Sequence, residues 1–81
     1  MKRHEWRDDG EGGMCQYRAT QHAGRWEFHT LLESDEDWVL HDPIPVEYLR
    51  RLREVLFRKY QRRRVPFEQI EQIDQMIQEA Q

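Results

Sequence analysis

The stretch from Pro45 to Arg64 constrains the fold of this chain most strongly, because its apolar residues recur with the period of an α-helix. They fall on one side of a helical wheel, which is the pattern of a helix with one buried face: Tyr48, Leu49, Leu52, Val55, Leu56 and Tyr60. Pro45 suits the first turn, where its missing N–H costs no hydrogen bond. The stretch therefore predicts an amphipathic helix over residues 45–62 whose apolar face needs a partner.

The rest of the chain offers two apolar patterns that can cover this face. Alternation of apolar and polar residues predicts strands at 2–7, 14–22, 25–32 and 37–41. A second helix is predicted over residues 66–79, since Phe67, Ile70, Ile73 and Ile77 recur at helical spacing. The expected fold is α+β: a three- or four-stranded antiparallel meander followed by a two-helix hairpin packed on one face of the sheet. Residues 1–81 are expected to form a single small domain.

The strand registers follow from keeping apolar residues on one face, because a slip of one residue reverses the facing of a strand. An even-numbered loop at Ala23-Gly24 pairs Gln21 with Trp26, Ala19 with Phe28, and Tyr17 with Thr30. If a turn or loop at residues 8–13 pairs Arg7 with Met14, Trp6 lies opposite Cys15 and His4 opposite Tyr17. A loop over residues 33–37 is expected to set Trp38 beside Leu32 and Leu40 beside Thr30. The predicted core is Trp26, Phe28, Trp38, Leu52, Leu56, Ile70 and Ile73.

The composition is highly polar, with 36% charged residues and a mean hydropathy of -1.11. Such values lean toward disorder, but three Trp, three Tyr and three Phe at regular spacings favour a folded chain. No apolar run approaches the roughly 18 residues of a membrane span. The start of the chain also lacks the apolar segment of a signal peptide. The expectation is a cytoplasmic protein without membrane contact.

No residue pattern indicates a reaction centre. The only soft ligands are Cys15 and four histidines, none at a short metal-binding spacing such as CxxC or HxxxH. Cys15 lies on the predicted buried face, where a thiol is usually inert packing. Ser34 lies in an acidic loop that disfavours a developing anion, and no glycine-rich phosphate loop is present. We expect no catalytic, metal or cofactor-binding residues, and a protein that is not an enzyme.

Charge is distributed unevenly along the chain. Residues 50–64 carry a net charge of +7, whereas residues 1–49 carry -6 and residues 65–81 carry -4. The basic charges can be neutralised within the chain, by Glu54 on the same helix and by acidic residues of the second helix. Alternatively they form a surface for a partner.

Candidate partner-binding residues are Arg51, Arg58 and Arg62, which share the face opposite the apolar stripe, together with Arg63 and with Phe57, an aromatic residue outside the stripe. They predict a small non-enzymatic interaction module, a protein-binding adaptor or regulator, present as a monomer or weak dimer. The alternative is weak nucleic-acid binding through the basic helix Arg50–Arg64, helped by Arg18 and Arg25 on the sheet. An isoelectric point near 5.8 argues against strong nucleic-acid affinity.

Overall fold

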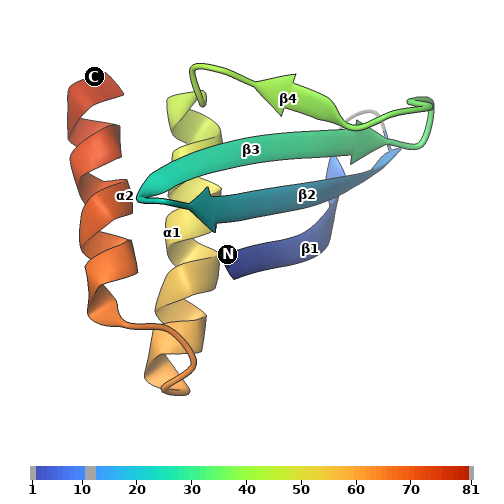
Figure 1. The fold of residues 1–81 in the computed structure, drawn as a ribbon. Helices are drawn as coiled ribbons and strands as arrows, with labels where there is room; N and C mark the ends of the chain where they lie inside the picture. The colour runs from blue at the N-terminus through green and yellow to red at the C-terminus, as the bar shows by residue number, and fades with distance from the viewer. Residues whose placement is uncertain (1, 11–12, 81) are drawn as a thin grey trace. The chain divides into compact units, whose positions relative to one another are not determined.

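The computed structural model describes residues 2–10 and 13–80 and confirms the α+β fold class. Four antiparallel strands are followed by two helices that contact each other (Figure 1). The strands and helices divide between two compact units, Met1–Pro43 and Ile44–Gln81. The prediction that residues 1–81 form one domain stays a prediction, and each unit is described by itself.

The first unit is a meander in which each strand pairs with the next, in the order β1-β2-β3-β4 (Figure 1). The bounds are β1 Lys2–Gly10, β2 Gly13–His22, β3 Arg25–Leu32 and β4 Val39–His41. The predicted register of β2 and β3 is confirmed, with Ala19 opposite Phe28. The two strands join through a two-residue turn in which Ala23 and Gly24 have φ of 52° and 79°. Two positive φ angles characterise the type I′ turn, whose twist matches that of the strands it joins.

The predicted register of β1 against β2 is wrong by two residues. Trp6 lies opposite Tyr17, not Cys15, because β1 extends through Gly10 and pairs there with Gly13. Part of the turn expected at residues 8–13, residues 11–12, lies outside the described residues. An even shift keeps each side chain on its predicted face. His4 and Trp6 therefore still lie on the same face as Tyr17.

The predicted register of β4 is wrong by one residue, so its two faces are exchanged. Val39 lies opposite Thr30, and Leu40 lies opposite His29. Six residues, not five, connect the strands. Within this connection, the side chain of Asp35 accepts a hydrogen bond from the N–H of Leu32 at 3.0 Å. Because the two faces of β4 are exchanged, Leu40 is 52% exposed instead of buried.

Aromatic rings pack around Phe28 on the apolar face of the sheet. Phe28 is fully buried, and its ring centroid lies 5.8 Å from that of Trp6, 6.1 Å from that of Tyr17 and 6.4 Å from that of His41. The predicted place of Trp38 in this core is wrong, because its ring lies against the guanidinium of Arg18 on the other face. The exchanged facing of β4 brings His41, not Leu40, to the apolar face.

The second unit contains the two helices, α1 Val46–Gln61 and α2 Phe67–Ala80, which lie side by side and are joined by a short linker (Figure 1). Pro45 is the N-cap of α1, one position before the first turn. The fully buried side chains lie on the predicted stripes: Leu49, Leu52, Leu56, Ile70 and Ile73. No helix in the described part of the chain is long and apolar enough to cross a membrane.

Replacing Phe28 by Ala tests the arrangement of the sheet. Removing a fully buried aromatic side chain should lower the free energy of unfolding by about 3–5 kcal/mol, measured by chemical denaturation. The matched control is Leu40→Ala, which removes an exposed side chain and should change stability by less than about 0.5 kcal/mol. A larger loss for Leu40→Ala than for Phe28→Ala would contradict the observed register of β4.

Candidate interaction site

The residues predicted to contact a partner lie along α1 and just after its end. All of them are exposed: Arg51, Phe57, Arg58, Arg62 and Arg63. Phe57 lies next to Leu56 in the sequence, yet Leu56 is fully buried and Phe57 is 38% exposed. The structure therefore confirms that Phe57 lies outside the buried stripe. Its part in binding stays a prediction.

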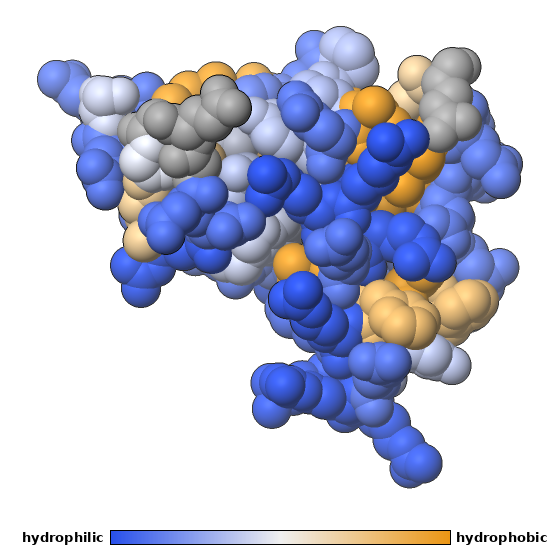
Figure 2. All heavy atoms as spheres, turned by 180° about the vertical axis from the view of Figure 1, so that it is seen from behind, coloured by the Kyte–Doolittle hydropathy of each residue, from blue (hydrophilic) through white to orange (hydrophobic). Residues whose placement is uncertain are grey.

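Phe57 belongs to an aromatic cluster that sequence analysis did not recognise: Phe57, Tyr60 and Phe67. The ring centroid of Tyr60 lies 6.4 Å from that of Phe57 and 5.2 Å from that of Phe67. Tyr60 is 40% exposed and Phe67 is 46% exposed, so their predicted place in the buried stripes is wrong. Both lie in the helix turns next to the linker, where the two rings contact each other and remain partly exposed. Figure 2 shows orange hydrophobic surface bordered by blue hydrophilic surface at this end of the helix pair.

Arg53 connects the aromatic cluster to α2. Its guanidinium forms an ion pair with Asp74 and lies 5.8 Å from the ring centroid of Phe57. In this ion pair an acidic residue of α2 neutralises a basic residue of α1, which is one of the two possibilities that the sequence leaves open. It does not extend to the end of the helix, because no ion pair among the described residues involves Arg58, Arg62 or Arg63. These three charges are exposed and not compensated by a carboxylate contact.

The positive charge at this end of α1 also acts on Lys59. Partial burial of its ammonium group, and then the charge of Arg64, hold the pKa of Lys59 below its ordinary value of 10.5. Both causes disfavour the protonated form. An anionic group bound here would interact with Lys59 as well as with the arginines.

The end of α1 has the hydrogen bonds of a Schellman motif. The N–H of Arg64 donates to the carbonyl of Lys59, and the N–H of Arg63 donates to the carbonyl of Tyr60, each at 2.8 Å. The motif needs a residue in the left-handed region, where glycine is usual. Here that residue is Arg63, with φ of 59°. A side chain with a Cβ costs about 1–2 kcal/mol in this conformation, so the backbone at Arg63 is strained.

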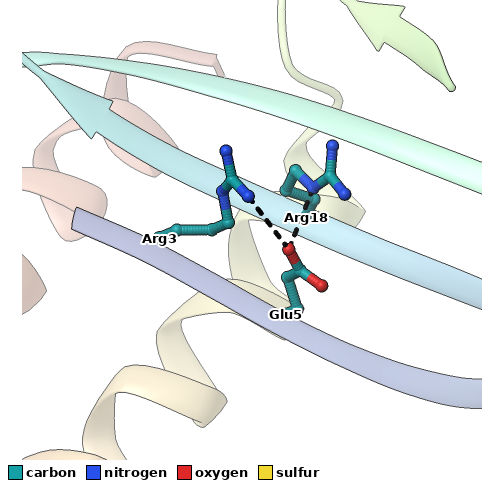
Figure 3. Close-up of polar contacts among 3 residues, drawn as sticks. All are labelled: Arg3, Glu5 and Arg18. Carbon is teal, nitrogen blue, oxygen red and sulfur yellow. Dashed lines mark hydrogen bonds and ion pairs between the residues drawn. The ribbon is translucent and has the colours of Figure 1, made fainter. Parts of the chain in front are cut away.

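The polar face of the sheet carries the arginine that was expected to assist nucleic-acid binding. The Nε atom of Arg18 donates to Glu5 at 3.1 Å, and Arg3 lies 3.7 Å from the same carboxylate oxygen (Figure 3). The Arg18 guanidinium also lies 4.0 Å from the ring centroid of Trp38. Arg18 is thus held by two neighbours on its own sheet, whereas Arg25 is exposed at the start of β3.

A hollow of about 420 Å³ lies in the first unit, where the turn between β2 and β3 meets the end of β4. It is lined by His22, Ala23, Arg25, Trp26, Glu27, Leu40, His41 and Asp42. These residues include both positive and negative side chains around one indole ring, so the hollow does not favour a single class of ligand. Of the residues predicted to contact a partner, only Arg25, which was expected to assist nucleic-acid binding, is among those that line it.

Within the described residues, no three His, Cys, Asp or Glu side chains lie close enough together to hold a metal ion. Cys15 is buried, at 5% exposure, on the apolar face of the sheet. Comparison with known proteins adds no homologue, since no protein-family model, curated protein or solved structure matches this chain.

His41 makes the stability of the first unit depend on pH. One of its ring nitrogens shares a hydrogen bond with the hydroxyl of Thr30 at 2.8 Å. Burial and then the nearby His29 hold the pKa of His41 below its ordinary value of 6.5. The unfolded chain therefore takes up this proton more readily than the folded chain. The stabilising contribution is complete above pH 6.5 and is lost as the pH falls toward the lowered pKa.

We accordingly expect the free energy of unfolding to decrease below pH 6.5, measured by denaturation at a series of pH values. His41→Gln should make that pH dependence shallower. His22→Gln, which changes an exposed histidine, is the control and should leave the dependence as in the wild type. Equal slopes for wild type and His41→Gln would show that other groups cause the acid sensitivity.

Proposed function

We propose that this chain is a small non-catalytic interaction module that binds an acidic segment of another protein at the end of α1. The observation that carries the proposal is the exposed aromatic cluster beside Arg58, Arg62 and Arg63, three arginines that form no ion pair within the described residues. Aromatic and arginine side chains dominate binding energy at protein interfaces. A guanidinium can also form two parallel hydrogen bonds with one carboxylate. A partner segment with carboxylates next to an apolar anchor fits this combination.

The conformation of Arg63 supports the same proposal. A glycine would satisfy the Schellman motif without strain, yet the sequence has a charged side chain at this position. Strained backbone is often found where a side chain has a functional role. Binding of a partner by the Arg63 guanidinium explains why the conformational strain at this residue is tolerated.

The test is to isolate binding partners from a lysate of the source cell and to compare variants. Phe57→Ala and Arg58→Glu should each reduce recovery of the same partner, because one removes the apolar contact and the other reverses a charge. Arg63→Gly should weaken binding while raising the free energy of unfolding by about 1 kcal/mol. Arg50→Glu, on the same helix, is the control and should bind as the wild type does.

The decisive feature of this test is that Arg63→Gly changes stability and binding in opposite directions. A misfolded variant would lose both, so the two causes are separated. The proposal is wrong if no partner is recovered, or if Phe57→Ala, Arg58→Glu and Arg63→Gly all retain full binding.

Nucleic-acid binding at the same surface is a second candidate, favoured by the proximity of uncompensated arginines to exposed aromatic rings. Arginines bind phosphates, and unpaired bases stack on aromatic side chains. Single-stranded oligonucleotides should then bind in low salt, with a log–log salt slope of about -0.7 per phosphate contact. A mobility-shift titration measures this. The absence of a shift, or an affinity independent of salt, would exclude it.

A further inference from the structure

β1 forms one edge of the sheet and is long for an edge strand. It pairs with β2 in an unbroken register over nine residues, from Lys2 to Gly10, and within the described residues it pairs with no other strand. The outer side of such a strand presents backbone N–H and C=O groups that are not used by the sheet. Proteins often block an edge with a proline, a bulge or charged side chains. β1 contains no proline and no bulge, so only its charged side chains can oppose pairing with another strand.

The charges on one face of β1 are ordered along the strand, whereas Lys2 and Asp8 lie on the other face with His4 and Trp6. Arg3 is near its beginning and Asp9 near its end, with Glu5 and Arg7 between them. All four lie on the polar face, because they alternate with His4 and Trp6. In an antiparallel pair of two such strands, the basic beginning of one lies beside the acidic end of the other. The strand is therefore complementary in charge to a second copy of itself.

We propose that the chain forms a dimer by antiparallel pairing of β1 with β1 of a second copy, with the two-fold axis at Trp6. This register places Arg3 opposite Asp9 of the second copy and Glu5 opposite its Arg7. Both pairs occur twice, so four pairs of opposite charge form on the polar face. The two four-stranded sheets then join into one continuous sheet with their polar faces on the same side.

Neighbouring registers lack this complementarity. With the axis at Glu5, this glutamate faces its own copy and Arg3 faces Arg7. With the axis at Arg7, this arginine faces its own copy and Glu5 faces Asp9. Like charges directly opposite each other destabilise a strand pair. A shift by a single residue would place the apolar face of one sheet beside the polar face of the other.

The side chains near the axis are already ordered within one chain. Glu5 is positioned by Arg3 and Arg18 (Figure 3), and the Trp6 ring is stacked on that of Tyr17 with centroids 5.3 Å apart. Ordered side chains lose less conformational entropy when they form an interface. A single pair of strands covers less area than a standard protein interface. The dimer is therefore weak and depends on protein concentration.

Sedimentation equilibrium over a range of concentrations tests this dimer in the full chain. Wild type should dimerise reversibly. Arg3→Asp and Asp9→Arg should each weaken dimerisation by about tenfold or more, because each variant places like charges opposite each other at both ends of the interface. Arg50→Asp and Glu71→Arg make the same changes in net charge at exposed helix positions and should dimerise as the wild type does.

The register is tested by mixing the two β1 variants. A heterodimer of Arg3→Asp with Asp9→Arg has opposite charges at both ends, so an equimolar mixture should recover dimerisation that neither variant shows alone. Arg3 and Asp9 are exposed, so both variants should fold as the wild type does, and circular dichroism checks this. A wild type that stays monomeric, variants that dimerise normally, or a mixture without recovery would each overturn the proposal.

Discussion

The two-residue turn at Ala23-Gly24 sets the facing of side chains in the central pair of strands. Because this turn has an even number of residues, Ala19 and Phe28 lie opposite each other on the apolar face. The same register puts Arg18 opposite His29 on the polar face. The packing of Phe28 against Tyr17 requires it. Without this register, charged side chains would occupy the apolar face.

The sequence correctly predicts the parts of the fold in which a strong hydrophobic pattern is combined with a short connection between elements. The β2–β3 hairpin and the buried positions of Ile70 and Ile73 are of this kind. β4 is different, because three residues carry too little alternation to fix a register. The register of β4 goes together with the position of Trp38, whose indole contacts Arg18. The hydrophobic pattern does not show this contact. The pattern of bulky residues around this strand predicts a core position for Trp38, but its ring covers a guanidinium.

The candidate site was also only partly predictable. Helical periodicity correctly separated Phe57 from the buried stripe, since that separation depends on angle alone. It assigned Tyr60 and Phe67 to the buried stripes because it ignores where a helix ends. Both residues have the right angle for burial, but they lie at the linker end of the helices, where their rings contact each other and stay partly exposed. Periodicity predicts which side of a helix is apolar, but it does not predict how completely that side is covered near the end of the helix.

The strained residue at the end of α1 has a consequence for how this sequence changes during evolution. The carbonyls of Lys59 and Tyr60 already accept backbone hydrogen bonds, so the Arg63 side chain is not needed to cap the helix. Selection for stability alone would therefore replace it with glycine or asparagine, the residues that tolerate a left-handed conformation best. Retention of a basic residue at this position among homologous sequences would then be a direct sign of selection for its charge.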